Sequence, residues 1–255
     1  ELRGAALVDE ARHLDRFEAS LAAISLPSPM PRRALQTVVR EVVRRNRVRD
    51  GIVYWQVTRG AARRDHAFPA PGTPPTLVVM VYARNILRSA AAARGVDVIV
   101  VPDTRWKRCD IKSVNLLANV LARQAARDAG AYEAWFIDPE GKITEGSSTT
   151  AWIVTPEGEV ITRPLGPEIL PGVTRAVILE AARKTGVPVV ERSFSLAEAS
   201  GASEAFLSAS SSVIVPVARI DGVPVGEGVP GRVTRRLRDA AVGISELSGR
   251  QLPSL

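Results

Sequence analysis

The sequence has 255 residues, of which 45% are hydrophobic and 24% are charged. This composition is ordinary for a globular protein, and the length allows one large domain or two modest ones. Apolar runs stay well short of the roughly 20 residues that a membrane-spanning helix needs, so no membrane association is expected. Cys109 is the single cysteine beside two histidines, which excludes an internal disulfide, fits a reducing cytoplasm and leaves too few ligands for a zinc site. No metal is predicted.

The formal net charge of +7 raises the question of nucleic-acid binding. The basic residues are scattered along the chain. The densest cluster, residues 40–49, alternates with the apolar Val42, Val43 and Val48, as in a helix that turns a solvated face outward. Nucleic acid is therefore not predicted as a partner.

The first half predicts two helices followed by two strands. Residues 10–26 and 31–49 carry apolar residues three and four apart, which is typical of amphipathic helices. The β-branched and aromatic runs 52–58 and 76–82 predict neighbouring strands. The alanine-rich stretch 84–95 has weak periodicity and is the candidate connection between two domains.

The second half mixes helices with hairpins. Turn sequences at 138–141 and 155–158 predict two hairpins, and Ser195 with Glu198 forms a capping box that opens a short helix. The remaining predicted elements are a strand at 96–101, a helix that follows Lys112 and runs to about Ala129, a helix at 173–184, strands at 204–208 and 213–217, and a helix at 230–241. This arrangement, without a regular βαβ alternation, predicts an α+β fold.

Lys112 is the residue with the clearest chemical signal. Four of the 34 lysine and arginine residues are lysines, and this one is flanked by Ile111 and Val114 where a strand turns into a helix. A partly buried lysine loses its proton, and its free amine then condenses with a carbonyl. The same residue would also fit a half-exposed lysine at a strand end, so the local pattern leaves both interpretations open.

Five segments that occur in a fixed order favour the covalent interpretation of Lys112. Residues 109–117, 144–148 and 169–175 are preceded by residues 53–60 and 64–69. With these motifs the chain resembles the fold-type IV pyridoxal phosphate enzymes (class IV aminotransferases), and within them the D-amino-acid transaminases. The resemblance covers nearly the whole chain and implies a two-domain α+β fold, with a small N-terminal domain and a larger β-rich domain that binds pyridoxal 5'-phosphate.

The resemblance implies a catalytic and cofactor-binding role for Lys112. Its amine would attach to the cofactor aldehyde and later shuttle the proton of the substrate α-carbon. Glu145 would pair with the ring nitrogen and keep it protonated. Taken alone, Glu145 would also fit a solvated residue at the end of a hairpin strand.

The other cofactor contacts implied by the resemblance surround the phosphate and the ring. Val173 and Thr174 open a predicted helix whose free N–H groups suit an anion, and Thr174 could also serve as an ordinary helix cap. Arg16 on the first helix corresponds to the family's phosphate-binding arginine. Leu170 would pack against the cofactor ring. Ser148 and Ser210 are the further predicted cofactor contacts, and Ala209 stands where the family commonly has a hydroxyl.

The resemblance implies that Arg64 and His66 bind the substrate. In the D-amino-acid transaminases an Arg-x-His pair holds the substrate α-carboxylate, and the planar fork of arginine suits both carboxylate oxygens. Ser211 is a further predicted substrate contact. The implied reaction moves the amino group of a D-amino acid, such as D-alanine, to a 2-oxo acid, such as 2-oxoglutarate.

The alternatives on the same fold are a branched-chain L-amino-acid transaminase and an aminodeoxychorismate lyase, neither of which is expected to carry the Arg64 and His66 pair. A basic binding protein or an inactive truncated relic is the alternative from another class. The relic is kept because the family has about thirty further residues before Glu1, including a tyrosine-bearing segment at the substrate pocket. The expected division is a small domain at 1–84, a linker at 85–90 and a large domain at 91–255, in a cytoplasmic homodimer.

Overall fold

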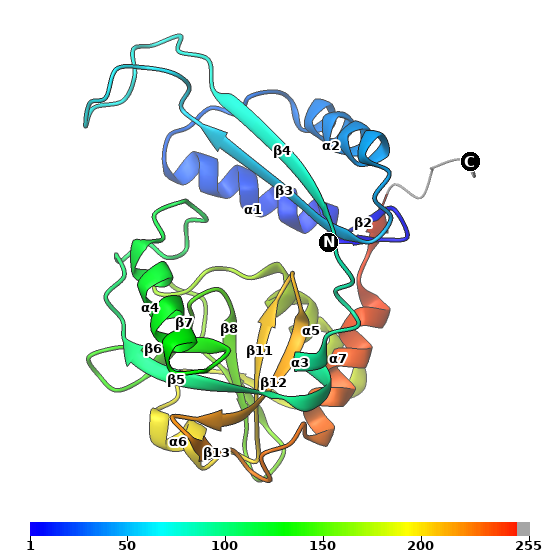
Figure 1. Cartoon of the computed structure of the whole chain (residues 1–255), viewed down its shortest axis with the longest axis vertical. Coiled ribbons are helices and arrows are strands. Elements are labelled where there is room, and N and C mark those ends of the chain that lie inside the picture. Colours follow the sequence, from blue (N-terminus) through cyan, green and yellow to red (C-terminus); the bar gives the residue numbers. More distant parts are fainter. Residues whose placement is uncertain (249–255) are drawn as a thin grey trace. The chain divides into compact units, whose positions relative to one another are not determined.

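The computed structural model describes residues 1–248 and divides them into two compact units (Figure 1). The first comprises residues 1–86 together with 246–248, and the second residues 87–245. Each unit has its own sheet and helices, which confirms the predicted two-domain α+β fold. Within residues 1–248, no helix is long and apolar enough to cross a membrane.

The first unit is built on a five-stranded sheet with the order β14-β2-β1-β3-β4. Its long members, β3 (Gly51–Thr58) and β4 (Thr76–Ala83), pair antiparallel over their full length and confirm the two predicted strands. The short members are β1 (Leu2–Arg3), β2 (Ala6–Val8) and β14 (Leu247–Ser248). Because β14 pairs with β2, residues 246–248 belong to the first unit. The sequence-based division had assigned all of residues 91–255 to the second domain.

Two helices complete the first unit and confirm the amphipathic patterns. They are α1 (Glu10–Ala23) and α2 (Arg32–Asn46). Leu14 of α1 and Leu35, Val39 and Val43 of α2 are buried in one apolar cluster with residues of the sheet. Leu35, Val39 and Val43 are each four residues apart, which places them on one face of α2.

The second unit is built on a nine-stranded mixed sheet. Its order is β10-β9-β8-β11-β12-β5-β6-β7, with β13 paired to β12. The pairs β10–β9, β12–β5 and β5–β6 are parallel and the others antiparallel. The bounds are β5 (Val96–Pro102), β6 (Glu133–Ile137), β7 (Ile143–Gly146), β8 (Thr150–Val154), β9 (Val160–Thr162), β10 (Val189–Glu191), β11 (Glu204–Ala209), β12 (Val213–Ile220) and β13 (Val223–Pro224).

Five helices accompany this sheet. They are α3 (Ala90–Arg94), α4 (Leu117–Asp128), α5 (Val173–Thr185), α6 (Leu196–Ser200) and α7 (Arg232–Ile244). The helices α5 and α7 contact each other and both contact β11. The predicted capping box is present at the start of α6, where Ser195 and Glu198 exchange side-chain to backbone hydrogen bonds.

One predicted helix begins later than expected. The sequence placed the helix directly after Lys112, but α4 begins at Leu117. The intervening residues form a local turn in which the Asn115 N–H donates to Ser113 Oγ and the Leu116 N–H donates to the Val114 carbonyl. Serine and asparagine favour such local bonds over helix, so Lys112 lies in a loop between β5 and α4.

Candidate active site

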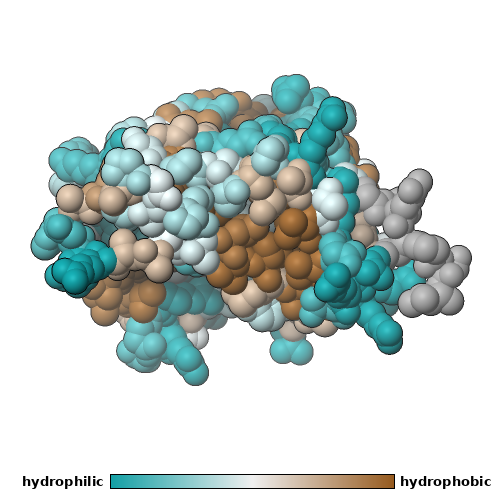
Figure 2. Space-filling model, turned by 90° about the horizontal axis from the view of Figure 1, so that it is seen from above, coloured by the Kyte–Doolittle hydropathy of each residue, from teal (hydrophilic) through white to brown (hydrophobic). Residues whose placement is uncertain are grey.

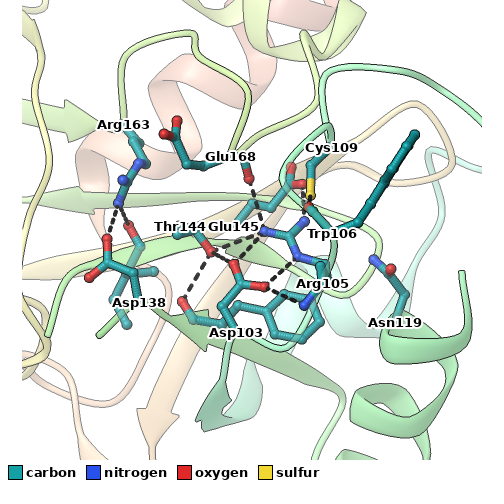
Figure 3. A network of polar contacts seen from close by, with 12 residues as sticks. Asp103, Arg105, Trp106, Cys109, Asn119, Asp138, Thr144, Glu145, Arg163 and Glu168 are labelled. Carbon is teal, nitrogen blue, oxygen red and sulfur yellow. Dashed lines mark hydrogen bonds and ion pairs between the residues drawn. The ribbon is translucent and has the colours of Figure 1, made fainter. Parts of the chain in front are cut away.

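A buried arginine organises the polar groups at the end of β5. Arg105 lies three residues beyond β5, and its side chain is 4% exposed. Its Nε and Nη2 donate to the two oxygens of Asp103 at 2.9 and 2.7 Å, which is the bidentate geometry of a strong pair. Nη2 also contacts Thr144 Oγ1 at 3.2 Å and the Glu168 carbonyl at 2.9 Å (Figure 3). The guanidinium lies over the Phe136 ring.

Glu145 is the second carboxylate of this network. One of its oxygens accepts a hydrogen bond from Arg105 Nη1, and the other accepts the Leu170 N–H at 3.1 Å. Burial raises the pKa of Glu145 to about 7, and the neighbouring Arg105 charge works in the opposite direction. The carboxylate is therefore held in place by two donors and poised to change its charge near neutral pH.

Asp103 responds differently to the same cation. Burial would raise its pKa, but the hydrogen bonds and charge of Arg105, together with Thr144 Oγ1, outweigh burial and leave the pKa below its ordinary value. When Asp103 and Glu145 are both ionised, the cluster that they form with Arg105 carries one net negative charge. A cation placed beside Glu145 would neutralise it, which is the electrostatic setting that a protonated pyridine ring requires.

Lys112 is exposed on the loop that leads from this cluster to α4. The loop is tied down nearby, since Ile111 is 6% exposed and the Cys109 N–H donates to the Pro167 carbonyl at 2.7 Å. Pro167 precedes the segment that carries Glu168 and Leu170. This backbone contact joins the loop of Lys112 to the segment that carries the partners of Glu145. The role of Lys112 itself stays a prediction.

The start of α5 forms a site suited to an anion. Gly172 is the N-cap residue and contributes no side-chain bond, so Val173 and Thr174 begin the helix with N–H groups available to a ligand. Thr174 Oγ1 and Ser210 Oγ lie 3.3 Å apart, which brings together two predicted contacts from distant segments. Thr174 is not the N-cap, so the capping interpretation of this residue is wrong.

The turn that carries Ser210 and Ser211 is conformationally strained. Val213 has φ 62°, a left-handed value that is rare for a β-branched residue. The Ser212 N–H donates to the Ala209 carbonyl and closes the turn. Ser211 is exposed and Ser210 half-buried, so the strained turn presents both hydroxyls at its tip.

Ser148 has a different contact from the one expected. Its hydroxyl donates to Glu133 Oε2 at 3.0 Å, and Ser147 and Thr149 donate to the same carboxylate. Glu133 is fully buried, so the three successive hydroxyls, together with Arg123 Nη1 at 3.3 Å, satisfy a carboxyl group whose burial would otherwise be costly. A cofactor contact of Ser148 stays a prediction beside this structural role.

The remaining predicted site residues belong to the first unit. Arg16 is half-buried on α1, and burial lowers the pKa of its guanidinium to about 10. Such a desolvated cation gains from an anionic ligand. Arg64 and His66 are exposed on the connection between β3 and β4.

Sequence reasoning missed Arg105 and Asp103 altogether. Arg105 is one arginine among many, and its partner Glu145 is 40 residues away in the chain. The one available signal was their position directly after an apolar strand, where functional side chains are often presented.

Comparison with solved structures first defines the class. The fold matches a branched-chain amino acid aminotransferase from Escherichia coli with a TM-score of 0.83 and 25% identity, over 94% of this chain and 79% of that one. It also matches a putative 4-amino-4-deoxychorismate lyase from Legionella pneumophila, with a TM-score of 0.83 and 21% identity over 92% of this chain and 85% of that one. The chain is thus a fold-type IV enzyme with the two-domain architecture of this class.

The sequence comparisons then give the family. Residues 3–220 match the family described as amino-transferase class IV. A D-alanine aminotransferase of Staphylococcus haemolyticus is 38% identical over 229 residues, which are 89% of this chain and 79% of that protein. The chain belongs to the class IV aminotransferases, and its cofactor is pyridoxal phosphate.

The residues present fit this cofactor. Glu145 offers a buried carboxylate for a protonated ring nitrogen, and the start of α5 with Thr174 and Ser210 offers N–H groups and hydroxyls for a phosphate. Leu170, whose N–H binds Glu145, is half-buried beside that carboxylate. These groups would hold the two ends of the molecule.

Proposed function

We propose that the protein is a D-amino-acid transaminase that moves the amino group of a D-amino acid, such as D-alanine, to a 2-oxo acid, such as 2-oxoglutarate. The observation that carries this proposal is the 38% identity to a D-alanine aminotransferase over 89% of the chain. The branched-chain enzyme with a similar fold shares 25%. The presence of Arg64 and His66 also favours the D-amino-acid subgroup over the alternatives on this fold.

In this proposal, Lys112, Glu145 and Arg105 have different roles in the reaction. When bound, pyridoxal phosphate supplies an electron-withdrawing ring that makes the α-proton of the amino acid acidic. The Lys112 amine would hold the cofactor and would take and return the substrate α-proton at its Nζ. Arg105 would hold Glu145 in place so that its carboxylate could pair with the ring nitrogen.

Binding is shared among the other predicted residues. The start of α5 with Val173 and Thr174, together with Ser210 and Arg16, would hold the phosphate by hydrogen bonds and charge. Leu170 would cover the ring, and Ser148 would add a polar contact. Arg64, His66 and Ser211 would bind the substrate and orient its carboxylate.

The first test is the visible absorption spectrum of the purified protein with pyridoxal phosphate. We expect a cofactor band that changes on addition of D-alanine and not of L-alanine. Lys112→Ala should abolish the band and lower the transamination rate by about 10²- to 10⁴-fold or more. Lys142→Ala, at a lysine of a hairpin turn, is the matched control and should keep both. A response to L-leucine alone, or release of pyruvate from aminodeoxychorismate, would overturn the substrate assignment.

We further propose that the protein works as a homodimer. Figure 2 shows one face of the molecule, on which several hydrophobic areas lie among hydrophilic ones. In the second unit, α4 and the turn before it expose five large apolar side chains, of which Leu117 is 71% and Leu121 62% exposed. Contiguous exposed apolar groups of this kind are typical of a protein interface, and a second copy is the occupant proposed for them. The free thiol of Cys109 fits the reducing cytoplasm as the compartment.

A further inference from the structure

Arg59 anchors the base of the connection between β3 and β4. Its Nη1 donates to the Ser25 carbonyl at 3.1 Å, and its Nη2 donates to the Ile24 carbonyl. Ile24 is the C-cap residue of α1. The free carbonyls at a helix C-terminus carry partial negative charge and favour a cation, so this arginine joins the end of β3 to the end of α1.

The same guanidinium also contacts the far side of the connection. It lies over the ring of Phe68, with 3.6 Å between Arg59 Cζ and the ring centroid. Phe68 remains 64% exposed, so this contact is not simply a consequence of core packing. Stacking of a guanidinium on an aromatic face is a favourable cation–π interaction, and here it pulls the middle of a long loop back to its base.

Arg64 and His66 lie between these two anchors. Asp65 Oδ1 accepts the N–H of His66 at 2.6 Å and the N–H of Ala67 at 3.3 Å, which sets a local turn between the two residues. At the neck of the loop, Gly60 has φ 93°, and a Cβ there would lie 2.1 Å from the Pro74 carbonyl oxygen. The segment is therefore held at its neck, in its turn and at Phe68.

We propose that Arg59 and Phe68 form a clamp that positions Arg64 and His66 for the substrate carboxylate. Neither clamp residue is proposed to touch substrate, and the inference rests on the proposed role of the Arg64 and His66 pair. A loop that is already ordered loses less conformational entropy when it binds a ligand. Loss of the clamp should therefore weaken substrate binding more than it slows the chemical step.

The test compares Arg59→Lys and Phe68→Leu in the cofactor-loaded enzyme. Lysine keeps the charge but loses the planar fork that reaches two carbonyls and stacks on the ring, and leucine keeps an apolar side chain without the π face. We expect the KM for D-alanine and for 2-oxoglutarate to rise about three- to tenfold with kcat changed less than twofold. Backbone hydrogen exchange of residues 61–70 should become faster in both variants.

Two further variants make the outcome decisive. Arg63→Gln changes an exposed arginine of the same loop and should leave KM and exchange unchanged. Arg64→Gln should raise KM at least as much as the clamp variants do, and an unchanged KM there would overturn the carboxylate role itself. A raised KM in Arg64→Gln with unchanged KM or unchanged exchange in both clamp variants would overturn the clamp alone. Because Phe68 is exposed, its variant keeps the test valid if Arg59→Lys folds poorly.

Discussion

At the residue level, the carboxyl group of Glu145 is governed by opposing effects. Burial favours its neutral form, whereas Arg105 favours the charged form, and the balance puts its pKa at about 7. This value lies above the ordinary pKa of a glutamate, so the folded apoprotein binds a proton that the unfolded chain releases near pH 4.5. Protonation of Glu145 is therefore one contribution to the pH dependence of folding.

The sign of that coupling gives a prediction for the apoprotein. The stabilisation from protonated Glu145 is fully present below about pH 4.5 and is lost as the pH rises through about 7. Between pH 5 and pH 8.5 the melting temperature of wild-type apoprotein should fall relative to that of Glu145→Gln, which stays neutral throughout. Glu157→Gln, in an exposed turn, is the control and should follow wild type. Parallel curves for wild type and Glu145→Gln would contradict the assignment.

At the level of elements, the start of α7 depends on a residue from a strand. Glu204 on β11 accepts the N–H groups of Val233 and Thr234 at 2.9 and 2.7 Å. A carboxylate at a helix N-terminus satisfies free donors and opposes the positive end of the helix dipole. The N-cap Gly231 leaves room for it, since a Cβ there would lie 1.9 Å from Glu204 Cδ.

Removal of this cap should therefore lower stability. Glu204→Ala should reduce the free energy of unfolding by about 1–3 kcal/mol, because two partly buried N–H groups lose their acceptor. Gly231→Ala should also destabilise the protein, since the added methyl group displaces the carboxylate. Urea unfolding followed by circular dichroism measures both. Glu227→Ala, at an exposed glutamate nearby, should stay within about 0.5 kcal/mol of wild type, and a similar small change in Glu204→Ala would refute the capping role.

At the level of the whole molecule, the apolar surface of α4 bears on assembly. Leu117 and Leu121 are four residues apart and therefore share one helix face. Leaving such side chains in water costs about 1.5–3 kcal/mol each relative to burial. A second subunit that covers this face would recover part of that free energy.

Light scattering of the cofactor-loaded enzyme tests this expectation. Wild type should have the mass of a dimer, and the double variant Leu117→Glu with Leu121→Glu should shift it towards the monomer because two charges would be buried in the interface. Val223→Glu places a charge at another exposed apolar residue, on β13, and should leave the dimer intact. A monomeric wild type would refute the homodimer.

Much of the fold could be predicted from local pattern. The helices α1, α2 and α5 and the strands β3 and β4 were found because apolar spacing and β-branched runs depend on neighbours within a few residues. The start of α4 was placed too early, since side-chain bonds in a turn compete with helix and leave no periodic signal. The pairing of β14 with β2 joins residues about 240 positions apart, and no local pattern encodes such a contact.

For the candidate site, too, some features could be predicted from short sequence motifs and others only from the folded structure. Sequence alone determined the family, the cofactor and the motifs that hold Lys112 and Glu145, because these are carried by short segments in a fixed order. The tertiary structure alone decided that Arg105 binds Glu145, that Thr174 meets Ser210, and that Arg59 joins Phe68 to the end of α1. Protonation and positioning depend on burial and on distances between groups far apart in the chain, and those quantities exist only once the chain has folded.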